Sequence, residues 1–154
     1  MKQSYRKIIG ALAILLATAV LLAGCGGTNS SSTEAKAEYQ YMTAAEVKEK
    51  IENSEEMVLL DIQVEEEWQE HHIAGSLPTH AYPVQSEEDK AKLDAVLSQL
   101  EGDCPIVIVC PRGGGGAERT YNYLKEKGIA EERLFILEKG MAGWPYEELT
   151  EKGL

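Results

Sequence analysis

The sequence predicts an α/β layer fold with a central, mostly parallel sheet flanked by helices on both faces. Short and nearly continuous apolar runs occur at 57–62, 106–110 and 134–137, as expected of strands that are buried on both faces of a sheet. Segments with helical signals lie between these runs. Strands that alternate with helices are typical of α/β folds, in which helices cover a parallel sheet.

Each expected helix has its own signal. Thr43, with Glu46 three residues later, matches a capping box that starts an amphipathic helix. An acidic segment suits a second, short helix, and a third segment places Leu and Val side chains at helical spacing. The last helix is ended by Gly128. The expected helices span 43–53, 64–71, 86–100 and 117–127.

The length and charge of the chain limit its possible functions. A chain of 154 residues suits one domain with a core of its own. The formal net charge is −11, and no stripe of basic residues with interleaved aromatics occurs. Because nonspecific binding to nucleic acid depends on Lys and Arg that neutralise phosphates, we expect no nucleic-acid partner.

The first residues have the layout of a secretory signal peptide. Residues 1–24 combine three early cations with an apolar run over 8–23. This run is short for a membrane span, which takes about 20 apolar residues. Leu22-Ala-Gly-Cys25 resembles the lipobox of bacterial lipoproteins, which implies that 1–24 is removed and that Cys25 is acylated. The alternative is an uncleaved signal anchor with an incidental cysteine.

These features predict an extracytoplasmic protein that is lipid-anchored to a bacterial membrane. Residues 25–38 are rich in Gly, Ser and Thr, so we expect a flexible tether there. The folded domain is expected over 39–154.

The loop after the second predicted strand carries the candidate chemistry. Ligands of open α/β sheets bind at the carboxyl ends of strands, where Cys110 lies. Glycines let backbone N–H groups turn inward to hold an anion, and the N-terminus of the next helix adds positive charge that favours a thiolate. Arg112 adds attraction for an anionic donor. The loop residues are Pro111, Arg112, Gly113, Gly114, Gly115 and Gly116.

This arrangement predicts a cysteine nucleophile whose persulfide the same N–H groups could hold. The simpler alternative is an inert Cys110 at a strand end, followed by a tight turn. Four adjacent glycines favour the functional interpretation, because ordering each costs about 1 kcal/mol more than ordering alanine.

Three motifs in order resemble the rhodanese family. Leu60-Asp-Ile-Gln-Val-Glu-Glu-Glu-Trp68 and His72-Ile-Ala-Gly-Ser76 resemble the family's Asp-Val-Arg, acidic segment, aromatic and His-Ile-x-Gly-Ala pattern. The Cys110 loop is the second motif. Leu137-Glu-Lys-Gly-Met-Ala-Gly-Trp144 is similar to the family's Leu-x-Gly-Gly-x-x-x-Trp. The resemblance covers nearly all of 39–154.

The resemblance implies a rhodanese-like fold and a sulfurtransferase that works by double displacement. Cys110 would take sulfane sulfur from thiosulfate, polysulfide or a persulfide and pass it to cyanide or a thiol. The resemblance implies no cofactor, and it makes five residues mainly fold-supporting: Asp61, His72, Gly75, Gly140 and Trp144. The alternatives are a non-catalytic sulfur carrier, a module that binds an unidentified protein partner, or a thiol redox sensor.

Two positions depart from the family pattern. Gly115 and Gly116 stand where a second basic loop residue is usual, and Gln63 replaces the Arg of Asp-Val-Arg. Thiosulfate affinity is therefore expected to be weak. Phosphatase or arsenate reductase activity is not expected, because Cys-x5-Arg would need Arg at position 116. Glu118 likewise replaces a glycine that a dinucleotide-binding fingerprint requires.

The remaining reactive residues have simpler explanations. Cys104 is separated from Cys110 by a predicted strand, about 20 Å at about 3.3 Å per residue, which excludes a disulfide between them. We expect Cys104 to be passive, with sulfur resolution as the alternative. His71 and His72 lack further ligands at supporting spacing, so no metal site is predicted.

Overall fold

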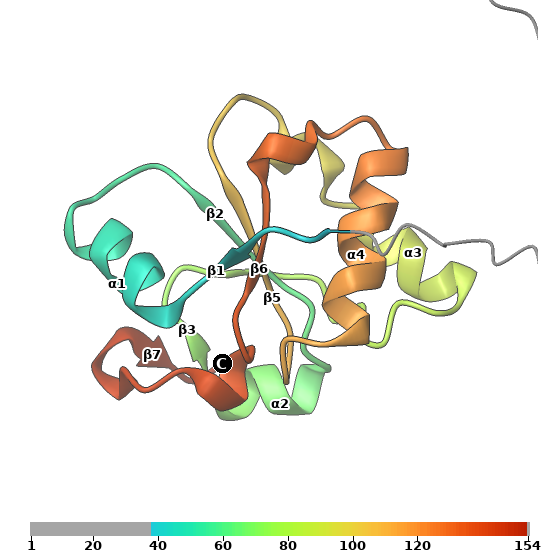
Figure 1. The fold of residues 1–154 in the computed structure, drawn as a ribbon. Helices are drawn as coiled ribbons and strands as arrows, with labels where there is room; N and C mark the ends of the chain where they lie inside the picture. Colours follow the sequence, from blue (N-terminus) through green and yellow to red (C-terminus); the bar gives the residue numbers. More distant parts are fainter. Residues whose placement is uncertain (1–37, 154) are drawn as a thin grey trace, which may run out of the picture. The chain divides into compact units, whose positions relative to one another are not determined.

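The computed structural model describes residues 38–153, which form a five-stranded sheet with strand order β1-β6-β5-β2-β4 (Figure 1). Every neighbouring pair in this sheet runs parallel. A separate antiparallel pair joins β3 to β7. The strands of the main sheet are β1 (Tyr41–Met42), β2 (Val58–Asp61), β4 (Leu77–Pro78), β5 (Ile106–Val109) and β6 (Leu134–Leu137), and the pair is β3 (His72–Ile73) with β7 (Thr150–Glu151).

The three predicted strands are confirmed as the three central strands of the sheet. They are β2, β5 and β6, and they are buried on both faces. The two edge strands were not expected, because a two-residue strand carries no periodicity that a sequence could reveal. Pro78 lies in the edge strand β4, a place where its missing N–H is tolerated.

Helices cover both faces of the sheet, as the sequence predicts. On one face α1 (Ala44–Glu52) packs with alternate residues of β2, β5 and β6. On the other face the long helix α4 (Gly115–Glu126) packs with the remaining alternate residues, beside α3 (Glu87–Asp94) (Figure 1). Residues 38–153 therefore contain two apolar clusters, one on each side of a buried parallel sheet.

The expected helices form, with two differences in their bounds. The helix expected over 86–100 ends at Asp94, and a 3₁₀ helix η1 (Leu97–Leu100) follows. Val96 leaves helical geometry with φ −110° and ψ 0°, yet it stays buried with Leu93 and Leu100. A 3₁₀ helix repeats every three residues and an α-helix about every four, so both bury the apolar side chains of this segment. The spacing of apolar residues in the sequence therefore does not distinguish a 3₁₀ turn from a continuous α-helix.

The other difference concerns the start of α4, which begins at Gly115 rather than at Ala117. The low helix propensity of glycine predicts that all four glycines lie in the loop. The acidic helix is confirmed as α2 (Glu65–Glu70), and the capping box at Thr43 is present.

The signal peptide over 1–24, the acylated Cys25 and the tether over 25–38 are predictions that lie outside the described residues, apart from residue 38 at the tether's end. Between residues 38 and 153, no helix is long and apolar enough to cross a bilayer.

Candidate functional site

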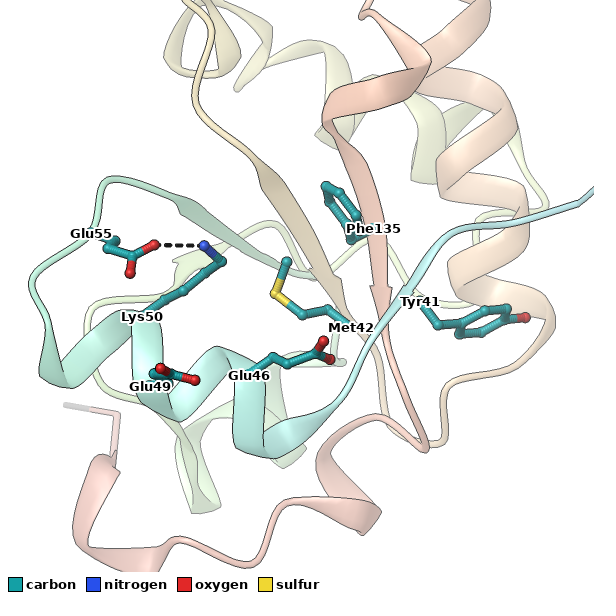
Figure 2. Close-up of a pocket in the computed structure, with 7 residues that line it drawn as sticks. All are labelled: Tyr41, Met42, Glu46, Glu49, Lys50, Glu55 and Phe135. Carbon is teal, nitrogen blue, oxygen red and sulfur yellow. Dashed lines mark hydrogen bonds and ion pairs between the residues drawn. The ribbon is translucent and has the colours of Figure 1, made fainter.

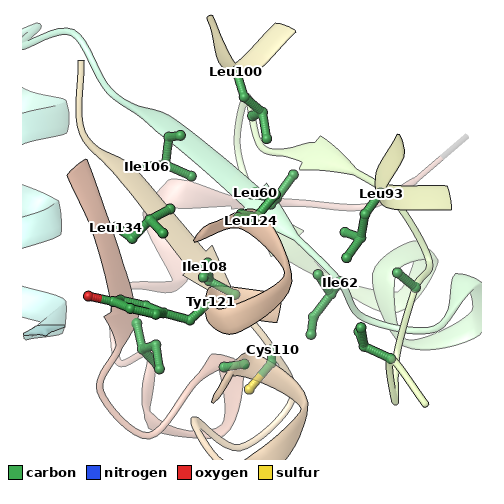
Figure 3. Packing of buried hydrophobic residues seen from close by; sticks show 14 of the residues in the cluster. Leu60, Ile62, Leu93, Leu100, Ile106, Ile108, Cys110, Tyr121, Leu124 and Leu134 are labelled. Atoms are coloured by element: carbon green, nitrogen blue, oxygen red, sulfur yellow. The ribbon is translucent and has the colours of Figure 1, made fainter. Parts of the chain in front are cut away.

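Strand alternation places the thiol of Cys110 on the α4 face of the sheet. Ile106 and Ile108 of β5 point toward α4, whereas Val107 and Val109 point toward α1. Cys110 continues the first row and is 1% exposed. Figure 3 shows its sulfur at the end of this buried row. The nucleophile predicted from the sequence therefore lies at the carboxyl end of a central parallel strand, below the start of α4.

The loop after Cys110 turns one backbone donor toward the sulfur. The N–H of Gly113 donates to Cys110 Sγ at 2.9 Å. Gly113 has φ +68°, a left-handed conformation that glycine adopts without strain. A backbone N–H in this position is a donor that a sulfur atom with developing negative charge accepts more strongly than a neutral one does.

A turn near the C-terminus holds the loop in place. The N–H groups of Met141 and Ala142 donate to the carbonyl oxygens of Cys110 and Pro111, at 2.8 and 3.0 Å. Gly140 packs so closely that a Cβ there would collide with the Cys110 carbonyl oxygen and lie 2.6 Å from Gly113 N. The motif over 137–144 therefore clamps the Cys110 loop, a role that sequence reasoning did not assign to it.

The four adjacent glycines have different surroundings. Only Gly113 has a positive φ among them. Gly115 and Gly116 form the first residues of α4, and a Cβ on Gly116 would lie 2.8 Å from the ring of Tyr82. Gly116 therefore allows close packing of α4 against Tyr82. A Cβ on Gly114 would meet nothing within 4 Å.

Asp61 lies beside this loop in the sheet but on the opposite face. It pairs in register with Val109, and strand alternation turns its side chain away from α4. Its carboxylate is fully buried and accepts hydrogen bonds from Gln63 N at 2.9 Å and Gln63 Nε2 at 3.2 Å. Burial raises the pKa of Asp61 to about 6, and the hydrogen bonds from Gln63 oppose that rise.

His72 ties α2 to the small β3–β7 sheet. Its Nδ1 lies 2.8 Å from the carbonyl oxygen of Trp68, and its ring stacks on the Trp68 ring at 3.7 Å. Its Nε2 lies 3.3 Å from Glu151 Oε1. These contacts occupy both ring nitrogens with structural partners. Between residues 38 and 153, no group of three or more His, Cys, Asp or Glu is placed to hold a metal.

A cavity of about 200 Å³ adjoins the loop on the α2 side. Arg112 is exposed at its edge, and two glutamates of α2 face the same space. This cavity therefore has both a cation and carboxylates beside the Cys110 loop. Its lining residues are Gln63, Glu67, Glu70, His71, Pro111, Arg112, Met141 and Ala142.

Another hollow, of about 320 Å³, lies between α1 and the β1–β6 edge of the sheet (Figure 2). Three of its charged side chains, those of Glu46, Lys50 and Glu55, already have partners. Glu46 accepts a hydrogen bond from Thr43 N at 2.8 Å, and Lys50 pairs with Glu55 at 2.7 Å. This hollow contains no nucleophile, so the loop of Cys110 remains the candidate site.

Cys104 lies at the opposite end of β5 from Cys110, before the strand begins. Both cysteines are free. The carbonyl oxygen of Cys104 accepts a hydrogen bond from Arg133 Nε at 2.9 Å, within the turn that precedes β6.

Comparison with known proteins identifies the domain. The pattern of the rhodanese-like domain family matches residues 43–147. No curated protein matches the chain significantly. A solved rhodanese-like domain protein from Staphylococcus aureus is 22% identical, with a TM-score of 0.59, and the match covers 75% of this chain and 99% of that one.

Two solved structures with described activities share the fold. Thiosulfate sulfurtransferase from Pseudomonas aeruginosa is 17% identical with a TM-score of 0.57, and the match covers 75% of this chain and 20% of that one. An As-Sb reductase from Leishmania major is 19% identical with a TM-score of 0.56, and the match covers 76% of this chain and 88% of that one. At these identities the likeness concerns the fold. The chain carries a single rhodanese-like domain and belongs to the rhodanese-like domain family.

Proposed function

We propose that the protein is a sulfurtransferase that carries sulfane sulfur as a persulfide on Cys110. The observation that carries this proposal is the hydrogen bond from Gly113 N–H to Cys110 Sγ, at the carboxyl end of a parallel sheet. The same donor would stabilise the negative charge of a persulfide, since that charge lies one bond further along the same side chain.

The reaction would proceed in two displacements. The Cys110 thiolate attacks the outer sulfur of thiosulfate, an S–S bond forms on Cys110, and the S–S bond of the donor breaks to release sulfite with its electron pair. Cyanide or a thiolate then attacks the outer sulfur of the persulfide, and the Cys110 thiolate leaves. A polysulfide or an organic persulfide would enter the first step in the same way. Neither displacement needs an external oxidant, reductant or cofactor.

Turnover tests this proposal. Thiocyanate formation from cyanide, with thiosulfate or polysulfide as donor, is expected for the wild-type chain and not for Cys110→Ser. Cys104→Ser is the matched control, because Cys104 lies at the other end of β5, and it is expected to retain wild-type turnover. Turnover that survives Cys110→Ser would overturn the assignment of the nucleophile.

Oxyanion chemistry of the reductase or phosphatase type is disfavoured at this site. Such chemistry needs a cation six positions after the cysteine, where Gly116 is buried below the Tyr82 ring. A Cβ there would already be 2.8 Å from that ring, which leaves no space for an arginine stem.

A sulfur carrier or partner-binding module is the second candidate. Cys110 is 1% exposed, so a large acceptor could reach its thiol only if the loop moves. A carrier of this kind would accept sulfur in the first displacement but would show no turnover with cyanide. An unidentified protein would then be the acceptor.

The proposed location is the outer face of a bacterial membrane, with the chain held by a lipid on Cys25. This part of the proposal rests on the sequence of residues 1–25, in which the charged start, the apolar run and Leu-Ala-Gly-Cys occur together.

A further inference from the structure

The guanidinium of Arg119 is a cation in a fixed position in the second turn of α4. Its Nε and Nη2 both donate to the carbonyl oxygen of Pro83, at 2.9 and 2.7 Å. Two hydrogen bonds to one oxygen fix the plane of the guanidinium. Among the contacts of residues 38–153, Nη1 makes no hydrogen bond and stays available for an anion.

This guanidinium extends back over the first residue of the helix. A Cβ built on Gly115 would lie 3.0 Å from Arg119 Nη1. Gly115 has no positive φ, so its backbone does not require glycine. The glycine instead leaves space that the guanidinium occupies, next to the end of the Cys110 loop. The missing side chain of Gly115 therefore makes the space in which the guanidinium of Arg119 lies.

The loop's own cation is in a different electrostatic setting. Arg112 lines a cavity that two carboxylates, those of Glu67 and Glu70, also line. Glu118, the acid in the first turn of α4, lies toward the β1 edge, where burial and its charge together raise the pKa of Tyr41. Arg119 lies on the side of the loop away from these acids. The hollow that it lines contains one carboxylate, Glu126, and a second cation, Lys90, so its surroundings are less acidic than those of Arg112.

We propose that Arg119 is a positioning residue that selects anionic sulfur donors, a role that rests on the sulfurtransferase function proposed above. A thiolate and a dianionic donor repel each other, so a fixed cation beside the loop would raise the rate of the first displacement. Because Arg119 does not hold the reacting sulfur, its loss should slow charged donors and leave uncharged reagents unaffected.

The test compares two reagents that modify Cys110. Thiosulfate is a dianion and delivers one sulfur. Methyl methanethiosulfonate is uncharged: the Cys110 thiolate attacks its methylthio sulfur, forms a mixed disulfide and releases methanesulfinate. Both rates are measured by mass on the peptide that contains Cys110, in the purified chain with Cys104→Ser, and polysulfide serves as a second anionic donor.

The matched control is Arg133→Gln. Arg133 also donates Nε and Nη2 to backbone carbonyl oxygens, those of Cys104 and Leu100, at 2.9 and 2.8 Å. It precedes β6, whereas Cys110 follows β5, and these strands are parallel. Arg133 therefore lies at the amino ends of the parallel strands, whereas the loop lies at their carboxyl ends. Its replacement removes one charge and two similar hydrogen bonds far from Cys110.

Arg119→Gln is expected to slow loading by thiosulfate about five- to tenfold, the effect of one nearby cation on a dianion close to the surface. Labelling by methyl methanethiosulfonate should stay within about twofold of wild type. Arg119→Lys should restore part of the thiosulfate rate, since it keeps the charge but not the two hydrogen bonds that fix its position. Arg133→Gln should change neither rate.

Two results would overturn the role of Arg119 but not the proposed sulfur transfer. One is an unchanged rate of thiosulfate loading in Arg119→Gln. The other is an equal decrease in the rates with thiosulfate and with methyl methanethiosulfonate, which Arg119→Lys does not reverse. The proposed function fails separately, and this inference with it, if neither thiosulfate nor polysulfide loads the wild-type chain while methyl methanethiosulfonate modifies Cys110.

Discussion

Gly140 illustrates how one residue determines the geometry of the candidate site. It has φ +58° and packs against the Cys110 carbonyl oxygen and Gly113 N. Gly140→Ala is expected to lower the free energy of unfolding by about 2–4 kcal/mol, because left-handed strain and a steric collision add. Urea unfolding measures this loss.

Gly75→Ala provides the control for backbone strain alone. Gly75 has φ +76°, and a Cβ there would meet nothing within 4 Å. Its replacement is expected to cost about 1 kcal/mol. If Gly140→Ala were no more destabilising than Gly75→Ala, the close packing of the 137–144 turn on the loop would be contradicted.

Asp61 makes stability depend on pH. Burial raises its pKa from 3.8 to about 6. The folded state thus holds this proton more tightly than the unfolded state, and the free energy of unfolding falls as pH rises between about 4 and 6. Asp61→Asn removes this titration. Relative to wild type, the variant should gain about 2–3 kcal/mol between these pH values, as measured by chemical unfolding. A difference that is constant with pH would contradict the buried carboxylate.

At the scale of elements, capping residues fix where two helices start. The side chain of Ser86 accepts from Asp89 N at 3.1 Å, and Thr43 has the corresponding bond from Glu46 N at 3.2 Å. Thr43→Ala and Ser86→Ala should each lower the free energy of unfolding by about 1 kcal/mol. Ser98→Ala, at an exposed position, should change it by less than about 0.5 kcal/mol. Equal effects of Ser86→Ala and Ser98→Ala in thermal unfolding would contradict this account.

The elements also show how far the sequence predicts the structure. Apolar runs identify β2, β5 and β6, and the box at Thr43 identifies α1, because burial and capping leave local signals. The edge strands and the clamp of Met141 and Ala142 on the loop escape prediction. Each depends on backbone hydrogen bonds between residues far apart in the chain, and such bonds place no requirement on side chains that a sequence could display.

The candidate site is predictable to a similar degree. The sequence identifies Cys110 and its loop, because a strand end followed by glycines is visible in the residues themselves. It does not identify Arg119 as part of the surroundings, because the contact of its guanidinium with the Pro83 carbonyl depends on how α4 packs. The sequence predicts a loop that extends to Gly116, whereas in the structure Gly115 and Gly116 are the first residues of α4.

At the scale of the whole molecule, the N-terminal segment is predicted to determine where the domain works. Replacement of Cys25 by Ser should abolish incorporation of labelled fatty acid and release the protein from the membrane fraction of producing bacteria. A Cys104→Ser chain should still be labelled, since Cys104 lies within the folded domain. Fatty-acid labelling that persists in Cys25→Ser would contradict the lipid anchor.

The central claim is that Cys110 carries sulfur, and intact mass tests it most directly. After incubation with thiosulfate or polysulfide, the wild-type chain is predicted to gain one sulfur atom, which cyanide or a thiol removes, while Cys110→Ser gains none. The sulfur-bearing peptide should contain Cys110 and not Cys104. A folded wild-type chain with a reduced Cys110 that gains no sulfur from either donor would contradict the account.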